Sequence, residues 1–240
     1  MLYFVPVPIG NLEDITLRAI KLLEKAQTII SEDPRQTGKL IQLLDLKTTA
    51  KYIQVTKNQH FNQTQITKEL ELLAKTEQQN TDPENEQIVC VVSDAGTPGL
   101  SDPGIEIIQI AQELKLKYTV LPGSNALVPS IVASGLVWKE FWFVGFLPIK
   151  KGRNKQWKKI ATSEIPVVLY ESVHRMEKFL AECKENLPLE REICIIKDIS
   201  KLHEVILRTK VSEIDNLNLN FKGEFAMVIG GAEKVKSEEF

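Results

Sequence analysis

The stretch from Ser93 to Gly104 places the tightest constraint on how this chain can fold. It reads Ser-Asp-Ala-Gly-Thr-Pro-Gly-Leu-Ser-Asp-Pro-Gly and follows the apolar run Ile88–Val92, which predicts a buried strand. Its glycines and prolines fix turns and let a ligand approach the backbone, while aspartate and hydroxyl side chains supply polar groups. Ligands of open parallel sheets bind outside the carboxyl ends of strands, where this loop falls. The stretch therefore predicts a ligand-binding loop. The alternative is an ordinary strand-to-helix connection, although most of these are shorter.

Two further glycine-containing loops follow predicted strands and precede predicted helices. Pro8–Asp14 follows the strand Leu2–Val7, and Pro122–Ala126 follows the strand Tyr118–Leu121. Asp14 is the predicted N-cap of the helix that starts at Ile15. Because the carboxyl ends of parallel strands meet at one edge, we expect the three loops to converge on one site.

The second half of the chain repeats the pattern of polar residues placed just after strands. Such residues follow the strands predicted at 166–170 and 192–197, namely Glu171, Ser172, His174 and Arg175, then Asp198, Ser200, Lys201 and Glu204. We therefore expect two α/β domains, residues 1–122 and 123–240, with a cleft between them. The polar run Glu77–Gln87 is expected to be a solvated loop.

Composition and motifs exclude several classes of protein. The chain has 240 residues, 43% of them hydrophobic and 26% charged, with a formal net charge of −2, as in an ordinary globular protein. Neither G-x-G-x-x-G, a Walker sequence nor G-x-S-x-G is present, which argues against dinucleotide, P-loop and α/β-hydrolase sites. Three dispersed cysteines predict reduced core thiols, a cytoplasmic location and no metal site. We expect no signal peptide and no membrane span.

Two charged clusters are candidates for chemistry. Glu32, Asp33 and Arg35 follow the predicted strand Gln27–Ser31, and adjacent carboxylates beside an arginine suit acid–base work and anchoring of a charged substrate. The alternative is that Asp33 caps the next helix, with Pro34 in its first turn and Arg35 solvated.

Lys150–Lys159 holds six cations and no acid around Trp157, which suits contacts with phosphates and a stacked base. The alternative is a solvated basic helix whose tryptophan lies in the core. His60 is a weaker candidate for a binding role at a strand-to-helix connection.

Several of these motifs together resemble the tetrapyrrole methylase superfamily, the class III methyltransferases that use S-adenosylmethionine. The resemblance runs from residue 2 to about residue 230, and within the family it points to the methyltransferases of small-subunit ribosomal RNA that act on the 2′-oxygen of a cytidine. The segments that carry it are Pro8–Ala19, Glu32–Thr37, Ser93–Gly104, Gly145–Pro148, Tyr170–Arg175 and Lys201–Glu204.

The resemblance implies a fold and a site. The fold is α/β, with two α/β/α domains, mixed sheets and the active site in the interdomain cleft; a homodimer is also implied. S-adenosylmethionine is expected to contact Ile9, Ser93, Asp94, Ala95, Pro98, Asn125, Ala126, Glu171 and Ser200. Glu32 or Asp33 is expected to accept the ribose proton, with Arg35 and Lys201 holding phosphate or charge. The RNA backbone is expected to follow Lys150, Lys151, Arg153 and Lys155.

The sequence departs from the family pattern at Val7, Pro34, Ser124-Asn125 and Val173, and we expect it to lack a short C-terminal extension that many members carry. Pro34 bears on the orientation of the base, and the missing extension on the RNA target. Two other functions stay open on the sequence: methylation of a small tetrapyrrole-type substrate, and a non-catalytic role in binding RNA during ribosome assembly. Ribosomal RNA or the small ribosomal subunit is the expected partner.

Overall fold

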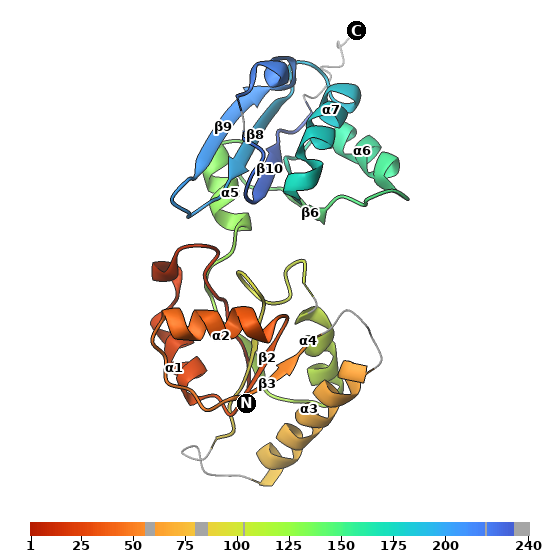
Figure 1. Cartoon of the computed structure of the whole chain (residues 1–240). Helices are drawn as coiled ribbons and strands as arrows, with labels where there is room; N and C mark the ends of the chain where they lie inside the picture. Colours follow the sequence, from red (N-terminus) through yellow and green to blue (C-terminus); the bar gives the residue numbers. More distant parts are fainter. Residues whose placement is uncertain (56–60, 80–85, 103, 219, 233–240) are drawn as a thin grey trace. The chain divides into compact units, whose positions relative to one another are not determined.

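The computed structural model describes residues 1–55, 61–79, 86–102, 104–218 and 220–232. The chain divides into two compact units, Met1–Asn125 and Ala126–Phe240. Each unit is an α/β domain built on its own five-stranded sheet (Figure 1).

Among its described residues, the first unit contains five strands and four α-helices, in the strand–helix alternation that the sequence predicts. They are β1 (Leu2–Phe4), α1 (Leu17–Lys25), β2 (Thr28–Ser31), α2 (Pro34–Leu43), β3 (Lys51–Gln54), α3 (Phe61–Gln79), β4 (Val89–Val92), α4 (Gly104–Glu113) and β5 (Tyr118–Val120). The strand order is β3-β2-β4-β1-β5, and every pair is parallel. All five strands therefore end at the same edge.

Helices cover both faces of this sheet. On one face, Ala19 and Leu23 of α1 and Ile41 of α2 pack against alternate residues of β1, β2 and β4. On the other, Leu70 of α3 and Ile107 of α4 pack against the remaining strand residues. The central strands are apolar on both faces, as strands buried between two helical layers must be.

Two sequence predictions about helix ends in the first unit are wrong. Asp14 lies in a short 3-10 helix, η1 (Leu12–Asp14), and α1 is capped instead by Thr16, whose Oγ1 accepts a hydrogen bond from the Ala19 N–H at 3.0 Å. Thr16 is the N-cap, the residue directly before the helix, and its hydroxyl oxygen accepts the hydrogen bond that the sequence assigned to Asp14, two residues earlier. The solvated loop expected from Glu77 is wrong for its first residues, because α3 runs through Gln79, and residues 80–85 of that prediction lie outside the described residues.

The second unit has a mixed sheet, in the order β6-β7-β10-β8-β9. Its elements are α5 (Leu127–Ser134), β6 (Trp142–Phe146), α6 (Arg153–Thr162), β7 (Val167–Glu171), η3 (Val173–Arg175), α7 (Met176–Asn186), β8 (Glu192–Lys197), β9 (Val205–Lys210), η4 (Val211–Asn216) and β10 (Phe225–Ile229). Only β6 and β7 pair in parallel; the other pairs are antiparallel.

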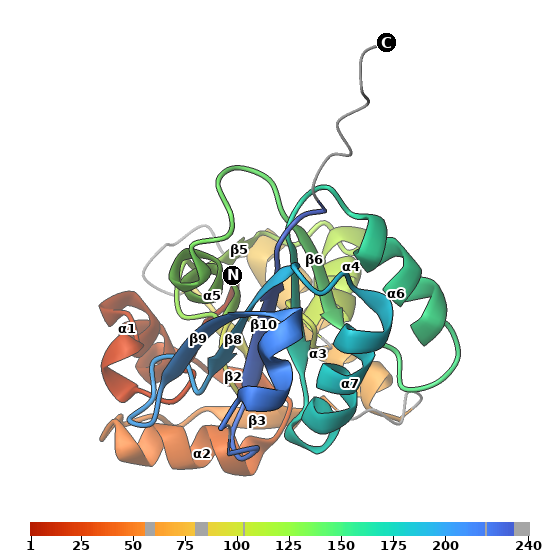
Figure 2. The same cartoon turned by 90° about the horizontal axis from the view of Figure 1, so that it is seen from above.

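This sheet is also covered on both faces. Trp157 of α6 and Phe179 of α7 anchor the larger core on one face, while Leu127 and Ile131 of α5 pack on the other. Figure 2 shows α6 and α7 on the side of the sheet away from α5. All three cysteines are free and buried, as the sequence predicts.

Candidate functional site

The three glycine-containing loops of the first unit meet at the carboxyl edge of the sheet, as their positions in the sequence predict. Val7 and Gly96 exchange two backbone hydrogen bonds of 3.0 Å, which joins the loop after β1 to the loop after β4. The Thr97 hydroxyl donates to the Ser124 carbonyl at 3.0 Å, and the Ser124 hydroxyl donates to the Asp14 carbonyl at 2.8 Å. The loops thus form one connected surface.

The loop Ser93–Gly104 is fixed by hydrogen bonds among its own groups. Ser93 is buried and donates its hydroxyl to the carbonyls of Ala95 and Gly96. Asp102 Oδ1 accepts the N–H groups of Gly99 at 2.8 Å and Gly104 at 2.7 Å. A Cβ added at Gly104 would lie 2.6 Å from the Gly99 nitrogen, so glycine is required there. Asp94 and Ala95 stay exposed between these fixed points.

The turn Glu32–Arg35 is connected to the same loop. The Asp33 backbone N–H donates to Asp94 Oδ1 at 3.0 Å. Asp33 also caps α2 and binds the exposed Arg35 through both carboxylate oxygens, at 3.0 Å to Nε and 2.8 Å to Nη2. These hydrogen bonds from Arg35 lower the pKa of the Asp33 carboxyl. Asp33 is therefore a weaker proton acceptor than a free carboxylate. The helix cap at Asp33, with Pro34 in the first turn of α2, is confirmed.

The remaining expected donor contacts of the first unit lie on the same edge. Ile9 and Pro98 are buried among these loops, and a Cβ at Gly96 would approach Ile9 Cγ2 to 3.4 Å. Glu32 is half-buried, and its carbonyl accepts a hydrogen bond from Gln54 Nε2 at 3.3 Å. Asn125 ends the first unit, and Ala126 begins the second as the N-cap of α5.

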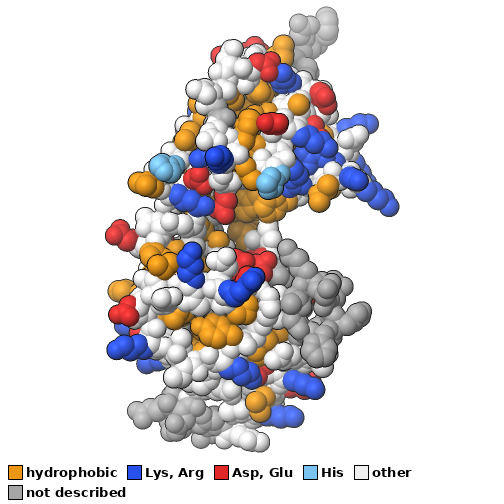
Figure 3. Space-filling model, viewed as in Figure 1, with side chains coloured by type: hydrophobic (Ala, Val, Ile, Leu, Met, Phe, Trp, Pro, Cys, Tyr) orange, Lys and Arg blue, Asp and Glu red, His pale blue; other side chains and the backbone are white. Residues whose placement is uncertain are grey.

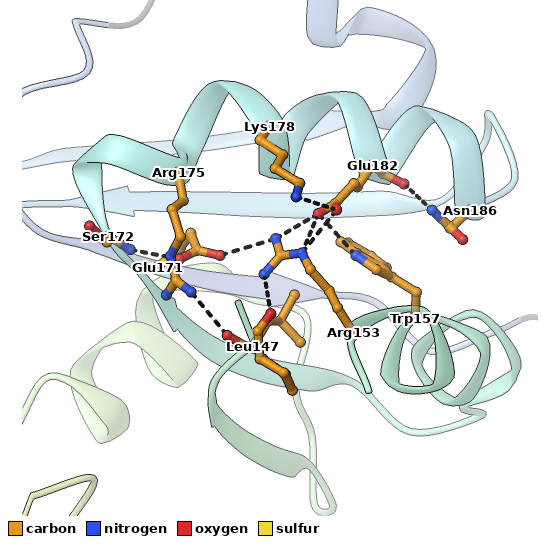
Figure 4. A network of polar contacts seen from close by, with 10 residues as sticks. Leu147, Arg153, Trp157, Glu171, Ser172, Arg175, Lys178, Glu182 and Asn186 are labelled. Atoms are coloured by element: carbon orange, nitrogen blue, oxygen red, sulfur yellow. Dashed lines mark hydrogen bonds and ion pairs between the residues drawn. The ribbon is translucent and has the colours of Figure 1, made fainter. Parts of the chain in front are cut away.

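In the second unit, Glu171 belongs to a buried polar network (Figure 4). Its carboxylate lies 2.5 Å from Arg175 Nη2 and 3.4 Å from Arg153 Nη2, and it accepts the Ser172 N–H at 2.8 Å. Arg153 also binds Glu182, with Nη2 2.6 Å from Oε2. The acceptor positions of Glu171 are thus used by the protein itself.

Arg153 differs from its basic neighbours. Its side chain is only 3% exposed, whereas Lys150, Lys151 and Lys155 are exposed. Burial alone would lower the pKa of the Arg153 guanidinium, but the hydrogen bonds and charge of Glu182 and Glu171 raise it, so the group stays charged. Trp157 is buried beside it and donates Nε1–H to Glu182 at 3.1 Å. The geometry favours a structural role for Arg153 and a core position for Trp157.

The exposed lysines form a basic surface on the second unit, which we define as Lys150, Lys151, Lys155, Lys158 and Lys159. Figure 3 shows Lys and Arg side chains gathered on the side of this unit where Figure 1 places α6. His60, the weaker candidate, lies outside the described residues.

The loop after β8 has a strained backbone. Asp198 and Ser200 both take positive φ, 52° and 67°, a conformation that non-glycine residues rarely adopt. Asp198 binds Lys197 Nζ at 2.7 Å and the Glu224 N–H at 3.1 Å, and Lys201 Nζ lies 3.5 Å from its carboxylate. Lys201 also pairs with the exposed Glu224 at 2.7 Å. Residues with strained backbone conformations are concentrated at functional sites. The strain in this loop therefore supports the expected functional roles of Ser200 and Lys201.

Of two residues that organise these sites, sequence reasoning included Asp102 in the predicted ligand-binding loop and missed Glu182. Asp102 has a recognisable signal, because an aspartate two residues before a glycine commonly accepts backbone N–H groups in a turn. Glu182 has none: it is 29 residues from Arg153, and only the packing of α6 against α7 brings them together.

Comparisons with known proteins agree with this geometry. The profile of a family described as Tetrapyrrole (Corrin/Porphyrin) Methylases matches residues 1–215. A protein of Campylobacter fetus named Ribosomal RNA small subunit methyltransferase I is 38% identical over 235 residues, which cover 95% of this chain and 83% of that protein.

Two solved structures share the fold. The cobalt precorrin-4 methyltransferase CbiF superposes with a TM-score of 0.64 at 16% identity, over 95% of this chain and 94% of that one. Uroporphyrin-III C-methyltransferase from Thermus thermophilus, complexed with S-adenosylhomocysteine, gives a TM-score of 0.60 at 18% identity, over 95% and 96% of the two chains. Among the described residues, no helix is long and apolar enough to cross a membrane.

Proposed function

The chain belongs to the tetrapyrrole (corrin/porphyrin) methylase family, and on this premise we propose that it methylates the 2′-oxygen of a cytidine in small-subunit ribosomal RNA. The methyl donor is S-adenosylmethionine. The observation that carries the proposal is the similarity to ribosomal RNA methyltransferases along nearly the whole chain, combined with three loops joined at one edge of a parallel sheet.

The residues at this edge fit such a donor. A sulfonium donor bears a positive charge, an amino-acid part and a nucleoside part, so it needs a carboxylate, backbone polar groups and an apolar wall. The exposed Asp94 supplies the carboxylate, and the buried Ile9 and Pro98 supply apolar surface. Ala95 is small and exposed beside Asp94 and leaves the backbone approachable. We propose that Ser93, Asn125 and Ala126 complete these contacts.

The donor supplies an activated methyl group, which is transferred in line to the ribose oxygen. The protein must take up the hydroxyl proton as the carbon–oxygen bond forms and the carbon–sulfur bond breaks. We propose Glu32 as the proton acceptor, because Arg35 occupies both carboxylate oxygens of Asp33 and lowers its pKa. Asp33 then holds Arg35 in place, and the outer edge of that guanidinium is available to a phosphate.

Amide variants of the two acids test whether Glu32 accepts the proton and Asp33 positions Arg35. Glu32→Gln is expected to lower kcat by about 10²- to 10⁴-fold, the range for loss of a general base, while donor affinity is kept. Asp33→Asn is expected to act mainly on KM for RNA, since it removes the charge that orients Arg35. Equal loss of kcat in both variants, or full activity of Glu32→Gln, would contradict the assignment.

The second unit contributes charge for the RNA backbone. We propose phosphate contacts for Lys150, Lys151 and Lys155, and leave out the buried Arg153. Lys201 can join them, because its shorter ion pair, 2.7 Å to Glu224, is with an exposed carboxylate, and exposed ion pairs contribute little and exchange readily; its contact with Asp198 is longer, at 3.5 Å. Ser200 remains a proposed donor contact. Glu171 is proposed to position Arg175 and the Ser172 backbone rather than to touch the donor.

The decisive experiment offers the protein S-adenosylmethionine labelled in its methyl group together with small ribosomal subunits or their RNA. Ribose methylation at one cytidine is expected, with its loss in cells that lack the protein. Methylation of a porphyrin precursor and not of RNA would show that the substrate is a small tetrapyrrole-type molecule. Failure to bind S-adenosylmethionine by calorimetry would favour a non-catalytic RNA-binding protein.

Two further properties go with this proposal. The substrate predicts a cytoplasmic location, and the family resemblance predicts a homodimer. Light scattering after size exclusion measures the mass directly, and a species of about 27 kDa, the mass of one chain, would refute the dimer.

A further inference from the structure

One group of aromatic residues in the second unit is partly exposed and lies outside the residues used so far. Phe143 and Phe146 of β6 both pack against Tyr170 of β7, with ring centroids 5.2 Å and 5.8 Å away. Residues three apart in a regular strand point to opposite faces of the sheet. Here the pairing of β6 with β7 shifts register between Phe143 and Gly145, and Gly145 has a φ of 66°.

This irregularity is a β-bulge, and its effect is to turn Phe146 onto the face that holds Phe143 and Tyr170. Bulges of this kind redirect a side chain and are frequent near functional sites. The redirected Phe146 ring is 50% exposed at the end of β6. Exposure of half of a large aromatic ring to water is unfavourable, and a ligand that covers the ring would remove this free-energy cost.

A fixed guanidinium lies over the same ring. Arg175 Cζ is 5.9 Å from the Phe146 centroid, in the range of a cation–π contact. Its Nη2 pairs with the buried Glu171, and its Nη1 donates to the Leu147 carbonyl at 3.0 Å. Glu171 is in turn held by Arg153 and by the Ser172 N–H (Figure 4). The arginine is therefore positioned before any ligand arrives.

The surroundings of Phe146 select a negatively charged ligand. The exposed Lys150 and Lys151 follow it by four and five residues, and no acidic residue occurs in the sequence between Phe146 and Glu164. The nearby acid Glu171 is buried and neutralised by two arginines. An aromatic ring next to cations matches a nucleobase with its phosphates.

We propose that Phe146 and Arg175 form a stacking platform for one unpaired base of the RNA substrate, with Lys150 and Lys151 binding the phosphates next to it. The base must be unpaired, because bases inside an RNA duplex are covered by their neighbours. This inference rests on the proposed RNA methylation and adds a nucleotide-binding subsite to it.

The test measures the affinity for a fluorescein-labelled single-stranded RNA of about 12 nucleotides, within the site sizes of single-strand binders, by anisotropy at several salt concentrations. Phe146→Ala and Phe146→Leu are expected to weaken binding by about 5- to 150-fold, the range for loss of one stacked base. Leucine keeps apolar bulk without an aromatic face. Phe146→Trp is expected to keep the affinity.

Salt dependence separates stacking from charge. The Phe146 variants are expected to keep the slope of log affinity against log salt. The double variant Lys150→Gln/Lys151→Gln is expected to reduce that slope by about 1.4, since each phosphate contact with a single strand contributes about 0.7. Trp138→Ala is the matched control, because Trp138 is 96% exposed and precedes the opposite end of β6.

Calorimetry with S-adenosylmethionine controls for folding and is expected to give the same affinity in every variant. If Phe146→Ala and Phe146→Leu bind RNA as the unaltered protein does, while that protein methylates RNA, the platform is refuted and the proposed function stands. If the unaltered protein neither binds nor methylates RNA, both fail. A loss equal to that of Trp138→Ala would also overturn the platform.

Discussion

Removing Arg153 tests whether the buried network of the second unit holds α6 and α7 together. Arg153→Met keeps most of the side-chain length and deletes the charge. The guanidinium donates to both oxygens of Glu182, at 2.6 to 2.9 Å, to the Pro148 carbonyl at 3.0 Å and to Glu171 at 3.4 Å. Its loss leaves two largely buried carboxylates short of a partner.

The size of the stability loss depends on the contacts that Glu171 and Glu182 keep after Arg153 is removed. Breaking a buried ion pair by removing one partner costs about 3 to 5 kcal/mol. Glu171 keeps Arg175 and the Ser172 N–H, and Glu182 keeps Trp157 and a 3.8 Å contact with Lys178. Because both acids retain some compensation, we expect a loss of about 3 kcal/mol, at the lower end of that range. The exposed Lys150→Gln should stay within about 0.5 kcal/mol.

Urea unfolding followed by tryptophan fluorescence is the suitable assay, because all three tryptophans lie in the second unit. The double variant Arg153→Met/Glu182→Met should recover part of the loss, since no unpaired charge is left on Glu182. A cost of Arg153→Met below about 1 kcal/mol at pH 7, or a double variant less stable than Arg153→Met alone, would refute the reasoning.

The same variant has a defined pH dependence. Burial alone would raise the pKa of Glu182, but hydrogen bonds from Arg153 and Trp157 offset it, and the pKa lies below its ordinary 4.5. A depressed carboxyl pKa contributes stability above the unfolded-state pKa that is lost as the pH falls through the folded value. The difference between Arg153→Met and the unaltered protein should therefore be largest at neutral pH and shrink below about pH 4.5. A stability difference between the two proteins that is larger at acidic pH than at neutral pH would contradict this prediction.

Three other outcomes follow from single contacts. Gly104→Ala should abolish S-adenosylmethionine binding in calorimetry, because its Cβ would lie 2.6 Å from the Gly99 nitrogen and force the loop to shift. Thr16→Ala should destabilise the first unit by about 1 kcal/mol in circular dichroism melts, and Thr16→Ser should restore it, because the hydroxyl caps α1. Burial raises the pKa of the cysteine thiols, to about 12 for Cys90 and about 11 for Cys194, so Ellman's reagent at pH 8 should react with the unfolded chain and not with the folded one.

The fold was largely predictable because its central strands, such as β2, β4 and β10, are buried on both faces. Runs such as Ile88–Val92 and Glu192–Lys197 are recognisable without knowledge of their neighbours, since both faces of a covered strand must be apolar. The meeting of three loops at one edge followed from the parallel order alone. Helix starts were less certain: Asp14 and Thr16 are both good caps two residues apart, and only the short η1 turn decides between them.

The candidate site was predictable in residue type and less so in role. The charge run Lys150–Lys159 suggests one phosphate-binding surface, yet Arg153 points into the protein because Glu182 and Glu171 lie there. Nothing near Arg153 in the sequence signals those partners. The platform at Phe146 was hidden for a related reason, since it depends on a bulge that changes which face of the sheet the ring occupies.

Asp33 shows how local backbone geometry assigns chemistry to one of two adjacent acids. In sequence, Glu32 and Asp33 are equivalent candidates for the base, and Pro34 between Asp33 and Arg35 is a departure that bears on the orientation of the base. The structure gives Pro34 the first position of α2, where no backbone N–H is needed and its fixed φ suits a helix. The proline therefore supports the turn that lets Asp33 cap the helix and bind Arg35. Because these hydrogen bonds lower the pKa of the Asp33 carboxyl, proton transfer is better assigned to its neighbour.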